Sequence, residues 1–339
     1  GQLPSDLKRV TDVLINLGLS PNIGAVLIVS LGCEGTDHAR MYEELCASGK
    51  PVRIIHIQEL GGTSRGIQAG IDAAQELVIA ISGQQRKPAD ISHVVMAIKC
   101  GGSDTTSGIA SNCVIGYVAD RLVDLGATVV FGETTEFLGG ERALARRAVG
   151  GEDGPVGRCI LEIVQRMEQR AKAVGEDMRG GQPTPGNIAG GLSSIEEKSL
   201  GAIMKSGHRP IQGVLEYPDR ITHQKGLWIK DTPGREPEIL TGMAATGAQL
   251  LMFSTGRGAP QGYPCMPVIK ICGNPLTYQR MEHDMDLNAG RIIQGKASIE
   301  EVGEDAFAKM LRVLSGEMTK NEALAYFGSV DILCLGPVI

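Results

Sequence analysis

Residues 93–104 read HVVMAIKCGGSD: an apolar, β-branched run is followed at once by Cys, two Gly, Ser and Asp. Such a run is typical of a strand that is buried on both faces, and the glycines permit a tight turn where the strand ends. Apolar runs before polar, Gly-containing loops also occur at residues 25–37, 52–63 and 127–136, with amphipathic stretches between them. This alternation predicts a parallel sheet covered by helices.

The second half of the chain has the same character. Apolar runs predict further strands near residues 211–215, 227–230, 248–253 and 268–272. Between the halves, residues 176–192 are rich in Gly and Pro, which is typical of a boundary or an active-site loop. We therefore expect an α/β fold with two Rossmann-like lobes, at residues 1–175 and 193–339, each with a mainly parallel sheet flanked by helices.

The composition excludes several classes of protein. The 33 Lys and Arg residues are outnumbered by 39 Asp and Glu residues and form no basic cluster, which argues against a nucleic-acid partner. No apolar run approaches the roughly 18 residues of a membrane-spanning helix, and the eight Cys form no CxxC pair. We therefore expect a soluble, cytoplasmic protein with reduced thiols and no membrane partner. Residues 5–17 predict an opening helix, whereas doubly wound domains more often begin with a strand, so we expect the first lobe to lack an N-terminal segment.

Polar residues follow each predicted strand of the first half. The strand exits read GCEGTD at residues 32–37, QELGGT at 58–63, CGGSD at 100–104 and GETTE at 132–136. Because parallel strands end at one edge of a sheet, where helix N-termini present free N–H groups, these exits predict a polar cleft suited to an anion.

Two of these exits share the pattern C-x-G-[ST]-D, which begins at Cys33 and again at Cys100. The pattern favours a repeated βα unit whose thiols and acids serve a metal or a reaction. The alternative interpretation is structural. Cys33 and Cys100 would then be small buried side chains, and Asp37 and Asp104 would cap the helices that follow.

Three basic side chains of the second half are also candidates. Arg257 follows an apolar strand within TGRG, where a guanidinium is suited to a bidentate grip on a carboxylate. Lys270 lies inside the apolar run VIKIC, so its ammonium binds either a substrate or an acidic partner. His208 follows a predicted helix and is either a general base or a favourable partner of the helix dipole.

Four separated segments together resemble the large catalytic domain of the altronate/galactarate dehydratase family, which also includes the large subunit of sulfolactate sulfo-lyase. They are KCGGSDTTSGIASNCVIGYVADRLVDLGATVVFGETTE at residues 99–136, GNIAGGLSSIEEKSLGAIMKSGH at 186–208, FSTGRG at 253–258 and DMDLNAG at 284–290. The resemblance covers nearly the whole chain. Two pieces typical of the family have no counterpart in the resemblance. One is an N-terminal segment of the large domain, and the other is a small β-rich domain that is a separate subunit in some members.

The resemblance implies a lyase that eliminates a leaving group from a 2-hydroxy acid to give a 2-keto acid, generally with Fe(II) and with no nucleotide cofactor. Removal of the proton beside a carboxylate places charge on that carboxylate, so the site needs a base together with cations or a metal. We expect a sugar-acid dehydratase that acts on a small anionic hydroxy acid. A sulfo-lyase that releases sulfite is the alternative. The expected partners are further copies of the chain and a small β-rich subunit or domain.

On this basis we assign roles to the candidate residues. The expected substrate-binding residues are Ser103, Asp104, Asn187, Arg257 and Lys270. The candidate bases are Lys198, Lys205 and His208. The candidate metal ligands are Cys33, Glu34, Cys100 and Glu133.

Two other classes of function are weighed against this assignment. Glycines at strand exits loosely resemble a dinucleotide-binding oxidoreductase, but no G-x-G-x-x-G follows the first predicted strand. A non-catalytic partner subunit is the second alternative, although a scaffold does not need a polar cleft at its strand exits.

Overall fold

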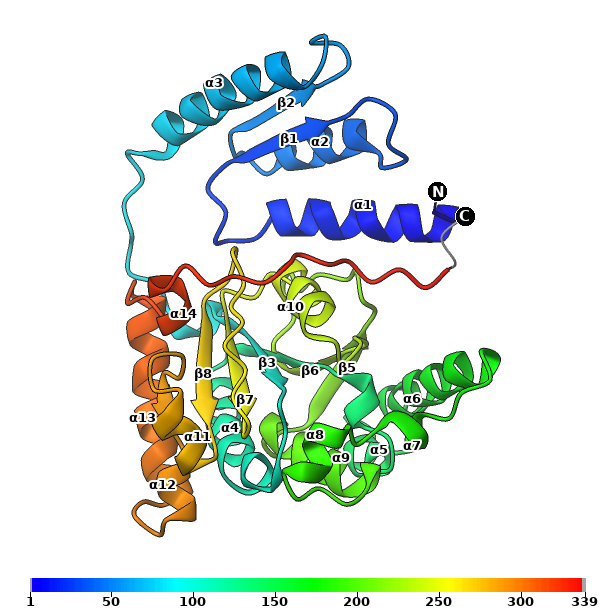
Figure 1. Cartoon of the computed structure of the whole chain (residues 1–339), viewed down its shortest axis with the longest axis vertical. Coiled ribbons are helices and arrows are strands. Elements are labelled where there is room, and N and C mark those ends of the chain that lie inside the picture. The colour runs from blue at the N-terminus through cyan, green and yellow to red at the C-terminus, as the bar shows by residue number, and fades with distance from the viewer. Residues whose placement is uncertain (1, 337–339) are drawn as a thin grey trace.

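The computed structural model describes residues 2–336, in which two separate parallel sheets lie one above the other (Figure 1). The smaller sheet pairs β1 (Val26–Ser30) with β2 (Val52–His56). Its helices are α1 (Pro4–Gly18), α2 (His38–Ala47) and α3 (Thr63–Ile81). Its core contains Ile15, Ile28, Met41, Leu45 and Val52. This unit accounts for the first three amphipathic stretches of the chain.

The larger sheet has seven parallel strands in the order β5-β6-β4-β3-β7-β8-β9. The strands are β3 (Val95–Cys100), β4 (Thr128–Phe131), β5 (Ile211–Leu215), β6 (Gly226–Lys230), β7 (Leu250–Thr255), β8 (Val268–Cys272) and β9 (Leu287–Asn288). Every residue of β4, β7 and β8 is buried, as expected for parallel strands with helices on both faces. The expected parallel α/β class is therefore confirmed.

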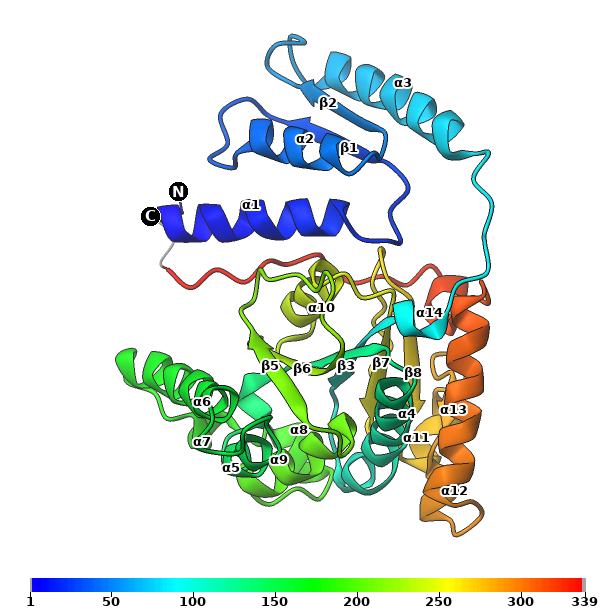
Figure 2. The same ribbon diagram turned by 180° about the vertical axis from the view of Figure 1, so that it is seen from behind.

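Helices and short turns cover both faces and the strand ends of the larger sheet (Figure 2). They are η1 (Ile91–His93), η2 (Ser107–Ser111), α4 (Asn112–Asp124), η3 (Thr134–Glu136), α5 (Glu141–Arg146), α6 (Pro155–Ala173), α7 (Met178–Gly181), α8 (Pro185–Ala189), α9 (Ile195–Ile203), η4 (Met204–Ser206), α10 (Glu236–Ala245), α11 (Pro275–Arg280), α12 (Gly290–Ile293), α13 (Ile299–Leu314) and α14 (Lys320–Ala323). Helices α4 and α13 belong to the main core on one face, and α10 belongs to the core on the other face.

The chain divides at a different place from the one expected. Strands β3 and β4, which belong to the expected lobe at residues 1–175, lie in the centre of the sheet that also holds β5 to β9. The break between the two sheets therefore falls at residues 83–94, and residues 176–192 connect elements of the larger sheet unit. The reason is strand order: β3 pairs with β4 and with β7, a strand more than a hundred residues away.

The C-terminal segment lies between α1 and the larger unit in both views (Figures 1 and 2). The buried Asp6 carboxylate of α1 accepts hydrogen bonds from the backbone N–H groups of Leu335 (3.0 Å) and Gly336 (2.7 Å).

Within residues 2–336, no helix combines the length and the apolar character needed to cross a bilayer.

Candidate active site

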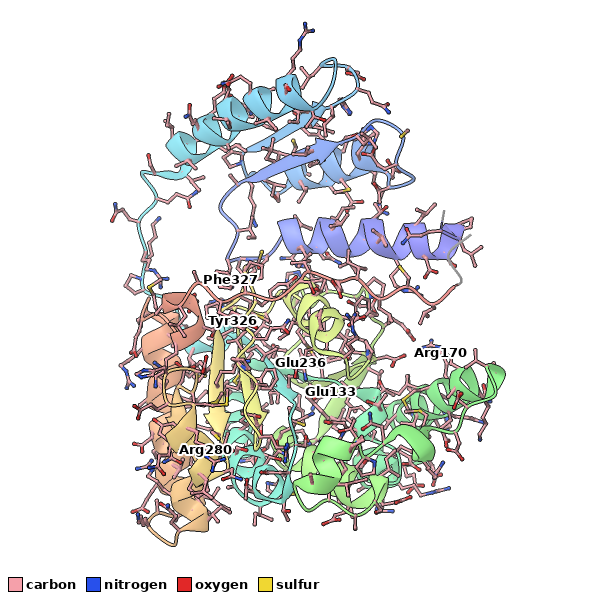
Figure 3. The ribbon with its side chains drawn as sticks, in the orientation of Figure 1. Glu133, Arg170, Glu236, Arg280, Tyr326 and Phe327 are labelled. Carbon is pink, nitrogen blue, oxygen red and sulfur yellow. The ribbon has the colours of Figure 1, made fainter. Side chains whose placement is uncertain are left out.

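The candidate site lies beyond the carboxyl ends of β3 and β4, which are neighbours in the larger sheet. Glu133, just after β4, adopts a left-handed backbone conformation (φ 72°, ψ 62°) that is unfavourable for a residue with a side chain. Its N–H donates to Thr232 Oγ1 at 2.8 Å. A Cβ atom on the preceding Gly132 would lie 2.3 Å from the same hydroxyl, so only glycine fits there. The Glu133 carboxylate reaches the end of the neighbouring strand β3, where it accepts from the Cys100 N–H; Figure 3 labels the residue.

The buried Glu133 carboxylate is held by two lysines and one backbone amide. Its Oε1 accepts from Lys99 Nζ at 3.1 Å, and its Oε2 accepts from the Cys100 N–H at 2.9 Å and from Lys205 Nζ. All three side chains are at most 1% exposed. Burying a charged carboxylate costs free energy unless its oxygens are hydrogen-bonded or ion-paired. The Glu133 carboxylate therefore needs all of these partners in place.

Lys205 is shared between three acidic groups. Besides Glu133, its Nζ lies 3.1 Å from Cys100 Sγ and 3.0 Å from Glu136 Oε2. Burial alone would lower the pKa of Lys205, but the surrounding acidic groups, with the Glu133 and Glu136 carboxylates as the charged ones, outweigh it and raise the pKa well above its ordinary value. Lys205 is therefore held as an ammonium ion, which suits an acid or a counter-ion and does not suit the role of base expected for it.

Cys100 and Glu136 form the other side of this cluster. The Cys100 thiol donates to Glu136 Oε2 at 2.8 Å, and burial, followed by the Glu136 charge, raises the pKa of the thiol well above its ordinary value. Lys198 Nζ lies 3.7 Å from Glu136 Oε1 and donates to Gln182 Oε1 at 2.7 Å. Lys198 thus occupies the rim of the cluster with its side chain 11% exposed.

Sγ of Cys100 and one carboxylate oxygen each of Glu133 and Glu136 lie within 4.8 Å of one another, a spacing that suits a metal ion. One thiolate with two carboxylates is a donor set for Fe(II) or Zn²⁺. The donors fit a divalent metal, but Lys205 Nζ already contacts all three residues. A metal would therefore be held here only with the Lys205 ammonium withdrawn.

We expect Lys205→Met to bind Co²⁺ more tightly than the wild type, by about tenfold or more, because the substitution leaves two buried carboxylates without their shared cation. Anaerobic titration, followed by the thiolate-to-cobalt absorption band, measures this affinity. The band should vanish in Lys205→Met/Cys100→Ser. Equal affinities of wild type and Lys205→Met would show that the ammonium does not compete for this position.

The pH dependence of stability follows from Glu136. Burial raises its pKa, but the Lys205 and Lys198 ammonium groups outweigh burial and lower the pKa to about 2. A pKa that is lower in the folded chain stabilises the fold above the ordinary Glu range, and this stabilisation is lost as pH falls from there toward 2.

We therefore expect Glu136→Gln to flatten the fall in stability between about pH 5 and pH 2, and to lower stability at pH 7. Urea unfolding at a series of pH values measures both effects. The exposed Glu59 provides the control Glu59→Gln. Wild-type and Glu136→Gln curves that run parallel would contradict the assigned ion pairs.

A second part of the candidate site is a cavity of about 420 Å³ at the ends of β3, β7 and β8. Its polar lining includes Asp104, Arg257, Asn274 and Arg280. Both guanidinium side chains are exposed, and among residues 2–336 neither has a carboxylate within ion-pair distance. Figure 3 shows Arg280 in the lower left of the larger unit, with Glu133 and Glu236 near its middle. Two free guanidinium groups in a small cavity are suited to a carboxylate or another planar anion.

Asp104 is rigidly placed within this lining. Its Oδ1 accepts from Thr106 Oγ1 at 2.6 Å and from the Ser107 N–H at 2.9 Å, which confirms the interpretation of Asp104 as a helix cap. Its Oδ2 accepts from Asn274 Nδ2 at 3.1 Å. A Cβ atom on Gly256 would lie 1.8 Å from Asp104 Oδ1, so a glycine is required beside this carboxylate.

Asn187 and Ser103 support the loop that carries Asp104. Asn187 Nδ2 donates to the Ser103 carbonyl at 2.9 Å, while Asn187 Oδ1 accepts from the Thr184 N–H at 3.0 Å. Both Asn187 and Ser103 are buried. The structure therefore brings Ser103, Asp104, Asn187 and Arg257 together, with Asn187 placed to hold the loop.

Three predicted residues do not join this site. His208 has its side chain 75% exposed and contacts Asp120 of α4, so its position after a helix end places it at the surface. Cys33 and Glu34 lie at the tip of β1 in the smaller sheet, where Cys33 is exposed and Glu34 accepts from the Gly32 N–H. The shared C-x-G-[ST]-D pattern gives both tips similar residues but does not place them in one sheet.

Four site residues were not predicted from the sequence. They are Lys99, Glu136, Asn274 and Arg280. Glu136 belongs to the GETTE exit, so its position at a strand end was an available signal. Lys99 is a charge inside an apolar strand, as Lys270 is, and the same signal applied to it. Asn274 and Arg280 follow β8 and carried no comparable signal.

The fold and the site define a parallel α/β protein whose strand ends hold a buried network of lysines and carboxylates beside a cavity lined by two arginines. Residues 91–333 match the family model of the C-terminal domain of D-galactarate/altronate dehydratase, and residues 1–82 match that of the second domain of D-galactarate dehydratase/altronate hydrolase. The chain belongs to this family. The two matches divide the chain where the structure separates its two sheets.

Individual relatives agree with this assignment. The chain is 36% identical over 326 residues to (2R)-sulfolactate sulfo-lyase subunit beta of Chromohalobacter salexigens, covering 96% of this chain and 82% of that protein. It is 33% identical to altronate dehydratase of Bacillus subtilis, covering 95% of this chain and 63% of that protein. It is 35% identical to galactarate dehydratase (L-threo-forming) of Escherichia coli, covering 89% of this chain and 58% of that protein. The chain thus spans about three-fifths of these two dehydratases.

Proposed function

We propose that the protein is a lyase that removes the proton beside the carboxylate of a small 2-hydroxy acid and expels a leaving group from the adjacent carbon. The product enol then becomes a 2-keto acid. The single observation that supports this most is the pair of unpaired guanidinium groups, Arg257 and Arg280, in a cavity that also holds Asp104. All the curated relatives named above are lyases by name.

The cavity residues serve substrate binding in this proposal. Arg257 and Arg280 would hold the substrate carboxylate and stabilise the charge that develops on it when the neighbouring C–H bond breaks. Asp104 and Asn274 offer an acceptor and a donor to the substrate hydroxyl groups. Asn187 keeps the Ser103–Asp104 loop in place through the Ser103 carbonyl.

The buried network provides the charge that the departing group needs. Lys205 is held protonated, and Lys198 lies at the rim beside Glu136, so either ammonium is a candidate proton donor to a leaving hydroxide. We also propose a divalent metal, Fe(II), whose ligands within this chain would be Cys100, Glu133 and Glu136. Such an ion would polarise a substrate oxygen as a Lewis acid.

The substrate is proposed to be a sugar acid of the altronate or galactarate type. The second candidate is (2R)-sulfolactate, because the chain spans 82% of the sulfo-lyase subunit but only about three-fifths of the dehydratases. The name of that relative, subunit beta, favours a further subunit, for which we propose the small β-rich partner. We also propose that the chain forms a homo-oligomer.

Parallel assays of altronate, galactarate and (2R)-sulfolactate separate these candidates. Keto-acid formation without sulfite from either sugar acid supports the dehydratase, and sulfite release from sulfolactate supports the sulfo-lyase. The protein should be assayed anaerobically with Fe(II), alone and with its β-rich partner. Turnover of none of the three acids in either form would contradict the proposed function.

A further inference from the structure

Three side chains stand in a row across the middle of the larger sheet. Phe253 on β7 is paired with Lys99 on β3 and with Lys270 on β8, so all three side chains lie on one face of the sheet. Lys99 Nζ lies 4.7 Å from the centre of the Phe253 ring, and Lys270 Nζ lies 3.7 Å from it. Two lysine amines thus flank a single aromatic ring in the interior of the protein.

The two amines differ in their partners. Lys99 Nζ donates to the Cys100 carbonyl at 2.7 Å and to Glu133 Oε1 at 3.1 Å. Lys270 Nζ is fully buried and, within residues 2–336, has no hydrogen-bond partner. A buried polar group without a hydrogen-bond partner needs an explanation, and a catalytic role is one of those that native proteins offer.

The acidic groups that face Lys270 are already paired. Glu236, on the first turn of α10, lies 3.9 Å from Lys99 Nζ. The Asp286 carboxylate accepts from the main-chain N–H groups of Lys270 (2.9 Å) and Lys320 (3.1 Å) and lies 3.6 Å from Lys309 Nζ. Asp284, on the same turn, is a weaker influence. Within residues 2–336, no acidic side chain lies within ion-pair distance of the Lys270 amine, although these three carboxylates act on it from further away.

Burial and the neighbouring charges act on Lys270 together. Burial disfavours its ammonium form, and the Lys99 charge across the ring acts in the same direction, while the charges of Glu236, Asp286 and Asp284 oppose them. The pKa of Lys270 is lowered to about 7 as a result. A desolvated lysine next to a second cation is a recognised way to obtain a neutral amine near neutral pH.

The row is close in sequence to the cavity that holds Arg257 and Arg280, although its own three side chains do not line that cavity. A Cβ atom on Gly101 would lie 2.6 Å from Glu236 Oε1, 2.9 Å from Lys99 Nζ and 3.0 Å from the Phe253 ring, so the backbone of Gly101 lies directly against the row. Three residues further on is Asp104, which lines the cavity. On β8, Lys270 is likewise four residues before Asn274 of the same cavity. Glu236, with its side chain 31% exposed, lies between the row and solvent.

We propose that the Lys270 amine is the general base that removes the proton from the carbon beside the substrate carboxylate. This inference rests on the proposed function and replaces Lys198, Lys205 and His208 as candidate bases. The C–H bond breaks, an N–H bond forms on Lys270, and the electron pair becomes the enolate. The leaving group then departs from the adjacent carbon with its bonding pair. The Lys270 ammonium returns its proton to water, and the partly exposed Glu236 lies beside the row.

The test compares Lys270→Met and Lys270→Arg with the wild type, on whichever acid the wild type turns over. The control Lys230→Met removes another fully buried lysine of the same sheet, whose Nζ donates to the Asp219 carbonyl (2.7 Å) and Thr246 Oγ1 (2.5 Å). Three quantities are measured: the exchange of the substrate C2 hydrogen with D₂O, kcat/KM as a function of pH, and the melting temperature.

We expect kcat/KM to fall about 10²- to 10⁴-fold in both Lys270 variants, with loss of C2 exchange, because neither replacement accepts a proton at neutral pH. Wild-type kcat/KM should rise as pH passes about 7, because the amine acts only when neutral. This rise should be absent from the residual activity of the variants. Lys230→Met, measured where it is folded, should keep both the exchange and the rise.

Every other outcome contradicts either the role of Lys270 as the base or the proposed function. Wild-type exchange in Lys270→Met, or an active Lys270→Arg, shows that Lys270 serves packing or charge and is not the base. If Lys270→Met lacks a cooperative melting transition, Lys270→Arg decides, because it keeps a side chain of similar length and the cation of the protonated lysine, but no group that accepts a proton. Turnover of no acid by the wild type contradicts the proposed function itself, whereas turnover with active Lys270 variants contradicts only the role of Lys270.

Discussion

Glu133→Gln is expected to lower the free energy of unfolding by about 3–5 kcal/mol, because it leaves the buried Lys99 and Lys205 ammonium groups without their common carboxylate. The amide keeps the shape of Glu133 but removes its charge. It also turns an NH₂ group toward either the Cys100 N–H or a lysine, and both of these are donors. Lyase activity should be lost together with stability. Urea unfolding at pH 7 measures the change.

A second variant separates the loss of pairing from a change in packing. In Glu133→Gln/Lys205→Met, the uncompensated ammonium of Lys205 is removed as well, so part of the lost stability should return. Glu304→Gln provides the surface control, because Glu304 pairs with Arg121 where both side chains are exposed, and such pairs contribute about 0–1 kcal/mol. The buried network is refuted as a source of stability if Glu133→Gln costs no more than Glu304→Gln.

Arg257→Ala is expected to lower kcat/KM by a factor that corresponds to about 2–5 kcal/mol of lost transition-state stabilisation. The reason is that the substrate carboxylate loses a guanidinium partner as it becomes enclosed in the cavity. The loss should be larger in kcat than in 1/KM if Arg257 stabilises the charge that develops during proton removal. Stability should change little, since the Arg257 side chain is exposed and unpaired within residues 2–336. Steady-state kinetics on the active substrate measure both parameters.

Two further variants complete this experiment. Arg257→Lys is the conservative replacement, and Arg209→Ala is the control away from the cavity. Lysine keeps the charge but not the two parallel donors of a guanidinium, so it should recover only part of the loss. Arg209 pairs with Asp124 at the surface away from the cavity, and its removal should leave kcat/KM unchanged. Near-wild-type turnover by Arg257→Ala would remove Arg257 from the site and with it the main support for an anion-binding cavity.

Local sequence patterns predicted strands β1 to β8, but not the two-residue β9, and they predicted polar groups at the strand ends. The run before Cys100 and the run before Glu133 became β3 and β4, and their polar exits lie together because adjacent parallel strands end at one edge. Asp104 caps the helix that follows it, as its position after the strand predicted. These features depend on residues within a few positions of one another.

Which residues form the site depended on the tertiary structure. Lys205 meets Cys100 across 105 residues of sequence, and Asn274 meets Asp104 across 170. No local period specifies such distances, because they follow from strand order and from where η4 packs on the sheet. The same limitation explains why Cys33, which has the same motif as Cys100, was assigned to a site in the other sheet.

The sequence by itself determined that this is a parallel α/β protein with glycines and ionisable groups at its strand ends, since these properties arise from local periodicity and from the backbone needs of tight turns. Only the tertiary structure decided which of those groups share a buried environment. Burial removes water from Lys99, Lys205 and Lys270 alike. The carboxylates that each lysine meets after folding then decide which ones carry a proton, and among residues 2–336 Lys270 finds no such contact.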